Sequence, residues 1–270
     1  MQANTETQWT ARPTLRLWHN LARSGSTLIG RCLGCMRGVC LLSEIHPLGA
    51  RYINPFGQAN EWFGLFSPED VARLSESTMA YPDLMLLIRE RAEAKGLTLV
   101  IRSWEHIDFY GPPFLARAPM RAMNVEHLAP VADLVRVATV RHPIDQWMSL
   151  SALPIMKGCL NLEHYLRGYR EFVEKCLPEV VIRYEDFTRD PDAEMARMCA
   201  GLGVEFDATY KERWAEYATI TGDVVSSRGL GERTIKPMGR REVIPSLIAK
   251  FAKNADYQVV IKRLGYGHPV

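Results

Sequence analysis

Three short stretches of the sequence are dense in aliphatic residues and do not alternate apolar with polar side chains. They read LTLVIR at residues 97–102, DLVRVATV at 133–140 and EVVIRY at 179–184. A strand with one solvated face alternates, whereas a strand covered on both faces is apolar almost throughout. We therefore predict an α/β fold in which a central, mostly parallel sheet lies between two layers of helices.

The rest of the chain follows the same alternation of strands and helices. Strands are predicted at residues 15–19, 38–42, 98–102, 134–140 and 180–184. Helices are predicted at residues 27–37, 67–76, 83–95, 144–151, 162–175, 193–201 and 245–255. No repeat or low-complexity tract interrupts this order, so residues 1–270 are expected to form a single domain. A short flexible N-terminus is expected over about residues 1–12.

Two segments fit the alternation poorly and are predicted to be long loops. Residues 51–67 are rich in aromatic and turn-forming side chains, and residues 221–242 are rich in glycine and basic side chains. Long loops in a compact domain often carry binding function. Each loop is therefore a candidate to contact a ligand, with a plain surface loop as the alternative.

The overall charge of the chain argues against some classes of partner. The sequence has 33 basic and 31 acidic side chains, which give a formal net charge of +2. A nucleic-acid coat or a surface for anionic membranes needs a larger basic excess, so neither is expected and any anion site must be local. The chain has no run of about 18 apolar residues and no export pattern in its first residues. We therefore expect a cytoplasmic protein without a membrane span.

The six cysteines, at positions 32, 35, 40, 159, 176 and 199, suit free thiols in a reducing compartment. Cys32 and Cys35 form a C-x-x-C pair, but no second pair of ligands completes the four that a zinc site needs. We therefore expect neither a metal site nor a redox centre at this pair.

A glycine-containing turn joins the first predicted strand to the first predicted helix, in LWHNLARSGSTLIG at residues 17–30. Such a turn aims several backbone N–H groups and the positive end of the helix dipole at one point, which binds an oxyanion. The candidate contacts are Arg23, Ser24, Gly25, Ser26 and Thr27. Arginine adds a charged fork, the hydroxyl groups add donors, and glycine lets the backbone approach the ligand.

This turn departs from the pattern that binds a nucleoside triphosphate with Mg²⁺. That pattern, G-x-x-x-x-G-K-[ST], requires a lysine on the β- and γ-phosphates. Asn20 stands at the first glycine position and Ser26 stands at the lysine position. A magnesium–triphosphate complex is therefore a poor fit to the turn, although it remains the basis of one alternative function.

The stretch RSGSTLI, at residues 23–29, resembles the 5′-phosphosulfate loop of the sulfotransferases that use 3′-phosphoadenosine 5′-phosphosulfate (PAPS). The resemblance implies a P-loop-like three-layer fold, PAPS as the sulfuryl donor and 3′-phosphoadenosine 5′-phosphate (PAP) as the product. It also implies that the transfer needs no metal. In order along the chain, the resemblance extends over about residues 15–265.

A second motif of that family is matched by VRVATVRHPIDQWMSL, at residues 135–150. A strand leads to Arg141, Pro143 follows, and Ser149 comes about two helical turns later. The resemblance implies that Arg141 and Ser149 bind the 3′-phosphate, and a guanidinium and a hydroxyl at this spacing can reach one anion.

A third match is VVIRYEDFTRDP, at residues 180–191. It resembles the family segment in which the tyrosine before Glu-Asp approaches the adenine ring. The resemblance implies that Tyr184 contacts adenine, whereas Glu185 and Asp186 brace the following turn. These two carboxylates are expected to be structural.

Residues 221–241 occupy the place of the family's C-terminal cofactor loop, which closes over the nucleotide and contacts its 3′-phosphate. The sequence SSRG makes Arg228 the first candidate for that contact. The alignment leaves three alternatives open, and they are Arg233, Lys236 and Arg240.

An acceptor hydroxyl needs a general base within about 3 Å, and three side chains compete for this role. Glu44, in LLSEIHP, resembles the catalytic glutamate of tyrosylprotein and several bacterial sulfotransferases in its spacing from the phosphate loop. His106, in VIRSWEHIDF, resembles the catalytic histidine of cytosolic steroid and phenol sulfotransferases. Both follow predicted parallel strands, whose carboxyl ends converge on a ligand. We rank Glu44 first and His106 second, and expect His46 to orient the substrate.

The sequence does not specify the acceptor. A small cytoplasmic molecule that offers a hydroxyl, or less often an amine, fits the resemblance. The rings of Tyr52, Phe56, Trp62, Phe63 and Phe66 are candidates for an apolar wall, and residues 110–113 for its rim. Two other functions stay open, namely an inactive relative that binds PAP without transfer, and a P-loop kinase-like phosphotransferase. The oligomeric state also stays open.

Overall fold

The structure is a computed structural model that describes residues 12–75, 79–222, 234–237, 239–240 and 242–269. Its centre is a five-stranded sheet in the order β2-β3-β1-β4-β5, and every pairing is parallel. The strands are β1 Thr14–Asn20, β2 Val39–Ile45, β3 Thr98–Ser103, β4 Asp133–Val140 and β5 Val180–Arg183. The predicted α/β fold and all five predicted strands are confirmed, with ends that shift by a few residues.

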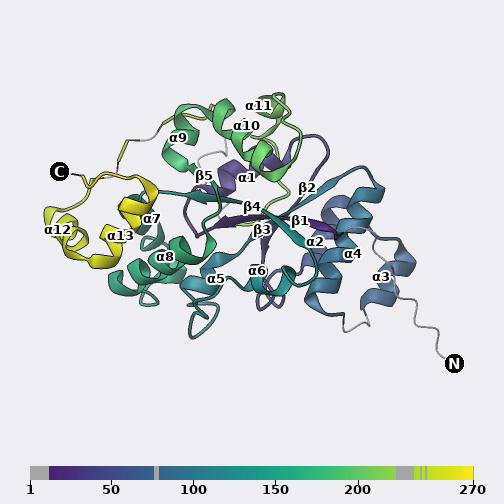
Figure 1. The fold of residues 1–270 in the computed structure, drawn as a ribbon, viewed down its shortest axis with the longest axis horizontal. Helices are drawn as coiled ribbons and strands as arrows, with labels where there is room; N and C mark the ends of the chain where they lie inside the picture. The colour runs from purple at the N-terminus through teal and green to yellow at the C-terminus, as the bar shows by residue number, and fades with distance from the viewer. Residues whose placement is uncertain (1–11, 76–78, 223–233, 238, 241, 270) are drawn as a thin grey trace.

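Helices cover both faces of the sheet, as Figure 1 shows. They are α1 Ser26–Gly34, α2 Pro55–Phe63, α3 Pro68–Ser75, α4 Tyr81–Ala94, α5 Glu105–Phe109, α6 Met123–Leu128, α7 Pro143–Leu150, α8 Leu162–Cys176, α9 Tyr184–Arg189, α10 Pro191–Leu202, α11 Tyr210–Arg213, α12 Pro245–Lys253 and α13 Ala255–Leu264. A short 3₁₀ turn spans Pro154–Met156. Each of the seven predicted helices is present, and the rest were missed.

The core forms three clusters, one on the α1 and α10 face of the sheet and two on the opposite face. β1 supplies both sides, because its successive side chains point to opposite faces. Trp18 packs with the α1 and α10 cluster, whereas Leu15 and Leu17 pack with α2 and α4. The sheet is thus buried on both faces, which is why its strands lack polar alternation.

The prediction of a long loop over residues 51–67 is wrong for residues 55–63, which form α2. Asn54 caps this helix, because its side-chain oxygen accepts a hydrogen bond from the Phe56 N–H at 3.0 Å. Pro55 starts the helix and Gly64 ends it with a φ of 58°. These are standard helix start and stop residues. The prediction of a loop gave more weight to the aromatic residues of the segment than to these helix start and stop residues.

The C-terminal helical region is divided into two helices. Asn254 has extended backbone angles that end α12, and its side chain accepts a hydrogen bond from the Tyr257 N–H at the start of α13. α13 packs on α8 and ends at Gly265. In the described residues, no helix combines the length and the apolar character needed to cross a membrane. Most of the expected flexible N-terminus lies outside the described residues.

Candidate functional site

The turn between β1 and α1 has the backbone geometry of an anion-binding loop. Gly25 has a φ of 89°, and a Cβ placed on it would lie 2.1 Å from Cδ2 of Tyr184. Glycine is therefore required there, both by the left-handed backbone and by the ring that covers it. In the described residues, α1 has no side-chain cap and no acidic residue in its first turn. Its first N–H groups are thus directed at the turn.

Two further side chains of this turn, those of Ser24 and Arg23, are of types that bind anions. Ser24 is 1% exposed, and among the described residues its Oγ atom has no hydrogen-bond partner. Buried hydroxyl groups are normally paired, so this one is suited to a ligand oxygen. Arg23 has a φ of 66°, and its Nε donates to Oγ of Ser149 at 2.8 Å.

The structure brings the three predicted motifs together. Arg141 follows β4 directly, and its Nη1 donates to the carbonyl oxygen of Arg23 at 3.4 Å. Its guanidinium carbon lies 4.8 Å from the centre of the Tyr184 ring, a cation–π distance. Ser149 lies on α7, which Pro143 starts. Arg23, Arg141, Ser149 and Tyr184 thus form one cluster from three distant parts of the chain.

Glu185 holds this cluster in place. Its Oε1 accepts a hydrogen bond from the backbone N–H of His142 at 2.9 Å, and its Oε2 accepts one from the Tyr266 hydroxyl at 2.7 Å. The carboxylate therefore ties the Arg141 turn to the C-terminal segment. Asp186 forms ion pairs with the neighbouring Arg183 and Arg189. Both contacts agree with the structural role expected from the sequence.

Glu44 lies on a bulge at the end of β2. Ser43 pairs with Arg102 and Ile45 pairs with Ser103, so Glu44 is the extra residue of β2 at this point. Its φ of 59° is unusual for a residue other than glycine. Bulges next to active sites redirect a side chain, and strained backbone gathers at functional sites. The Glu44 side chain stays 22% exposed.

The Glu44 carboxylate lies close to the predicted anion loop. A Cβ placed on Gly222 would lie 3.7 Å from Oε1 of Glu44 and 2.8 Å from Oγ1 of Thr27. Gly222 therefore lies close to both the predicted base and the predicted anion loop. The first two residues of the predicted C-terminal loop are thus part of the site. Arg228 and Arg233 lie outside the described residues, and Lys236 and Arg240 are exposed.

Arg102 is a site residue that the sequence reading did not assign. It is the last residue but one of β3, is 0% exposed, and its Nη2 lies 3.5 Å from Oε1 of Glu44. Its Nη1 donates to Oγ of Ser26 at 3.4 Å, and its Nη2 donates to the carbonyl oxygen of Thr221 at 3.0 Å. Burial lowers the pKa of Arg102, and the charge of Glu44 opposes that shift. A basic residue inside a buried strand was the available signal.

The two histidines near the site face inward. His106 is 2% exposed, and its ring nitrogen Nε2 lies 2.8 Å from the carbonyl oxygen of Pro112. Burial lowers the pKa of His106 to about 4, with a smaller opposing effect from Pro112. His46 bonds through Nε2 to Asp108 at 2.9 Å and accepts from the Leu48 N–H through Nδ1. Burial lowers its pKa to about 4 as well. Both nitrogens of His46 are used within the protein.

Four of the five aromatic residues proposed for an acceptor wall divide into two groups, and the fifth, Trp62, lies edge-to-face with Phe63 at 6.5 Å between ring centres. Phe56, Phe63 and Phe66 pack against the core cluster below α2 and α4. Tyr52 is 48% exposed and packs its edge against Trp104 and Phe114. Trp104 follows β3, and Tyr52 lies in the segment that follows β2. Both therefore lie at the carboxyl end of the sheet, where Glu44 also lies. Tyr110 of the predicted rim is wholly buried.

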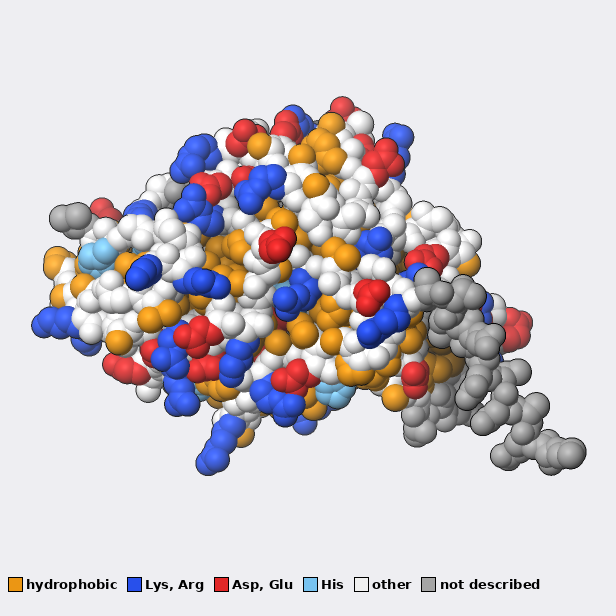
Figure 2. All heavy atoms as spheres, in the orientation of Figure 1, with side chains coloured by type: hydrophobic (Ala, Val, Ile, Leu, Met, Phe, Trp, Pro, Cys, Tyr) orange, Lys and Arg blue, Asp and Glu red, His pale blue; other side chains and the backbone are white. Residues whose placement is uncertain are grey.

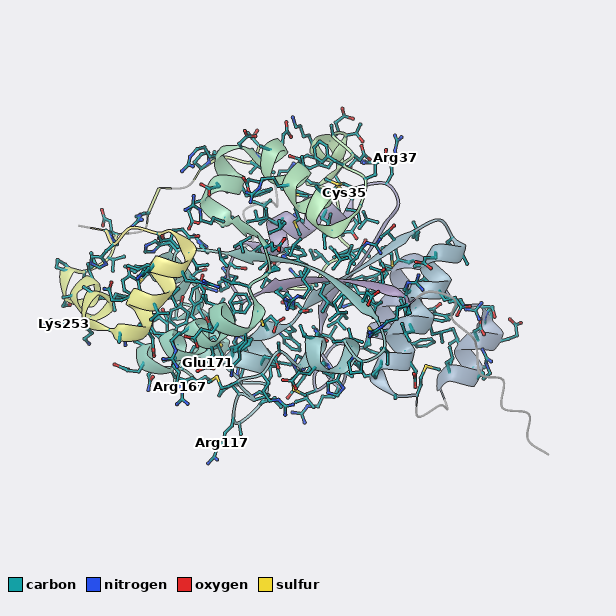
Figure 3. All side chains as sticks on the ribbon, viewed as in Figure 1. Cys35, Arg37, Arg117, Arg167, Glu171 and Lys253 are labelled. Carbon is teal, nitrogen blue, oxygen red and sulfur yellow. The ribbon has the colours of Figure 1, made fainter. Side chains whose placement is uncertain are left out.

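The C-x-x-C pair has the features of inert thiols. All six cysteines are free. Figure 3 shows Cys35 close to Arg37, past the end of α1, and its Sγ donates to the Cys32 carbonyl oxygen at 3.3 Å. Burial raises the pKa of Cys35 to about 11, so the reactive thiolate is disfavoured.

Comparison with known proteins points to one family. The model described as the sulfotransferase family matches residues 20–208, which is more than half of the chain. Among solved structures, the sulfotransferase domain of the Synechococcus PCC 7002 olefin synthase has a TM-score of 0.71 and 20% identity, over 97% of this chain and 98% of that chain. A sulfotransferase from Alicyclobacillus acidocaldarius has a TM-score of 0.45 and 15% identity, over 95% of this chain and 97% of that chain. No curated protein gives a match.

Proposed function

The chain belongs to the sulfotransferase family, and we propose that it transfers a sulfuryl group from PAPS to a hydroxyl group of a small acceptor. The observation that carries the proposal is the cluster of Arg23, Arg141, Ser149 and Tyr184 at the first turn of α1. Two guanidinium groups and an uncapped helix start suit a ligand with two separate anionic groups. An adjacent aromatic ring suits a base attached to them.

The residues present fit a PAPS-type donor. The N–H groups and hydroxyls of residues 23–27 would hold the 5′-phosphosulfate, with the orphaned Ser24 hydroxyl as one donor. Arg141 and Ser149 would hold the 3′-phosphate, and Nε of Arg141 is buried and unpaired in the described residues. Tyr184 would contact adenine. The bound donor supplies an activated sulfuryl group, and the chain's residues orient it and stabilise charge. No step of this scheme uses a metal.

Glu44 is the proposed general base. The acceptor hydroxyl gives its proton to the carboxylate as its oxygen bonds to sulfur, and the bond between sulfur and the phosphate oxygen breaks. Arg102, 3.5 Å from the carboxylate, would orient it, and Arg23 would stabilise the negative charge that develops on the leaving phosphate. Three observations favour Glu44 over His106: its partial exposure, its place beside Thr27, and the engagement of His106 with Pro112.

The proposed acceptor is a small cytoplasmic molecule, which offers a hydroxyl or less often an amine. An apolar wall for this acceptor could be formed by the packed rings of Tyr52, Trp104 and Phe114, at the carboxyl end of the sheet near Glu44. The six free thiols suit the reducing cytoplasm. Acidic and basic side chains are interspersed on the face shown in Figure 2, which does not favour a nucleic-acid partner. The same figure shows apolar atoms scattered between them.

The proposal is tested by following PAP release from PAPS with a panel of hydroxyl and amine acceptors, for wild type, Glu44→Gln, His106→Gln and the exposed control Glu205→Gln. We expect Glu44→Gln to lower turnover by about 100-fold or more, because general bases contribute on the order of 10²–10⁴. The PAP affinity of Glu44→Gln and the turnover of the control Glu205→Gln should equal those of the wild type.

Four results would overturn parts of this proposal. If Glu44→Gln keeps its turnover, Glu44 is not the base. If His106→Gln alone loses turnover, the base is His106. PAP binding without transfer to any acceptor would identify an inactive relative. Phosphoryl transfer from ATP with Mg²⁺ would identify the kinase-like alternative.

A further inference from the structure

The residue before Glu44 is held by a side chain from α2. β2 lies at the edge of the sheet. The backbone N–H of Ser43 donates to Oε1 of Gln58 at 2.7 Å, and Nε2 of Gln58 donates to the Ser43 carbonyl oxygen at 2.8 Å. One side-chain amide thus replaces the missing neighbouring strand at this single position. Gln58 is 6% exposed, so water does not compete strongly for these bonds.

The residue after Glu44 is held in a similar way from the other side of the chain. The carbonyl oxygen of Ile45 accepts a hydrogen bond from Nδ2 of Asn124 on α6 at 2.8 Å. It accepts a second bond from the backbone N–H of Trp104 at 3.1 Å. Asn124 is 1% exposed. Both flanks of Glu44 are therefore fixed by buried amide side chains that reach in from separate helices.

The conformation of Glu44 explains why such anchors matter. A φ of 59° is unfavourable for glutamate, and such a conformation persists only where the surroundings impose it. If either flank were released, the bulge could relax towards ordinary strand geometry, which would turn the carboxylate away from Thr27 and Arg102. Within the described residues, neither Gln58 nor Asn124 is hydrogen-bonded to the predicted anion loop at residues 23–27.

We propose that Gln58 and Asn124 are positioning residues that hold the strained Glu44 bulge in its working geometry. This inference rests on the proposed role of Glu44 as the base. Gln58 is the more specific of the two, because its planar amide offers one donor and one acceptor to the two backbone groups of one residue. Methionine has the same length but neither group, whereas a protonated carboxyl offers both.

The test compares turnover, PAP affinity and melting temperature in Gln58→Met, Gln58→Glu and the core control Met195→Ala. Met195 is buried in the cluster on the opposite face of the sheet, so it reports the effect of lost stability alone. We expect Gln58→Met to lower kcat about tenfold or more, with PAP affinity and donor KM unchanged. Met195→Ala should keep the wild-type kcat even where its melting temperature falls as much as that of Gln58→Met.

The Gln58→Glu variant provides a readout that a merely structural role would not move. Burial raises the pKa of an introduced carboxyl. As pH falls, that carboxyl gains the proton that it donates to Ser43, so kcat relative to wild type should rise from pH 8 to pH 5.5. Using the ratio removes the titration of Glu44 that wild type and variant share.

The outcomes separate this inference from the proposed function. If Glu44→Gln keeps its turnover, the role of Glu44 fails and the positioning role fails with it. If Glu44→Gln loses turnover but Gln58→Met keeps wild-type kcat, only the positioning role is wrong. A loss of kcat in Met195→Ala equal to that in Gln58→Met, or a flat kcat ratio for Gln58→Glu across pH, would also overturn it.

Discussion

Substitution of Gly25 by alanine should separate backbone strain from loss of ligand binding. Alanine at a φ of 89° costs about 1–2 kcal/mol in unfolding free energy, because left-handed backbone disfavours a Cβ. The new Cβ would also lie 2.1 Å from the Tyr184 ring, so that ring must move. Its movement breaks the stacking with Arg141, which contributes about 0.5–1 kcal/mol or more.

The matched control is Gly96→Ala. Gly96 has a φ of 71°, and a Cβ there would meet nothing within 4 Å. It precedes β3, at the opposite end of the strand from Arg102. In urea unfolding, Gly96→Ala should therefore lose about 1–2 kcal/mol of unfolding free energy, and Gly25→Ala should lose this amount plus about 0.5–1 kcal/mol for the broken stacking. In calorimetry, Gly25→Ala alone should weaken PAP binding about tenfold or more, which corresponds to about 1.4 kcal/mol. Wild-type PAP affinity in Gly25→Ala would refute the assignment of this turn.

Two further predictions concern Arg141 and His106. Arg141→Ala should reduce PAP affinity by about tenfold or more while 5′-AMP affinity changes little, because the lost guanidinium is assigned to the 3′-phosphate. Calorimetry with both nucleotides measures the two affinities. An equal loss of affinity for PAP and for 5′-AMP would contradict the assignment. Buried neutral His106 must gain a proton in the unfolded state, so its contribution to stability is present above about pH 6.5 and is lost as pH falls towards 4. Relative to His106→Phe, wild type should lose on the order of 3 kcal/mol over that range in urea unfolding, and a constant difference would contradict the burial of a neutral ring.

The sheet was predictable from sequence because its signal is local. The strands at residues 98–102 and 134–140 are dense in Val, Leu and Ile on both faces, as expected for strands that are covered on both sides. α2 was not predicted, because its aromatic residues suggested a loop, although Asn54 and Pro55 are typical residues for the start of a helix. The shorter helices α5 and α11 have no more than five residues, too few for a periodic pattern to be recognised.

The candidate site was predictable only where residues lie close together in sequence. The turn at residues 23–27 shows its glycine and hydroxyls directly. The roles of Arg102 and Gln58 depend on contacts between β3, the Glu44 bulge and α2, and no local pattern encodes them. The bulge itself arises from a shift of register between β2 and β3, which a single strand sequence does not reveal.

The most direct test of the donor assignment is a calorimetric comparison of PAP, 5′-AMP, ADP and ATP with Mg²⁺ on the wild-type protein. We predict that PAP binds most tightly, that chelation of metal leaves its affinity unchanged, and that removal of the 3′-phosphate weakens binding by at least tenfold, about 1.4 kcal/mol. Tight binding of ATP with Mg²⁺ together with no preference for PAP over 5′-AMP would contradict the account.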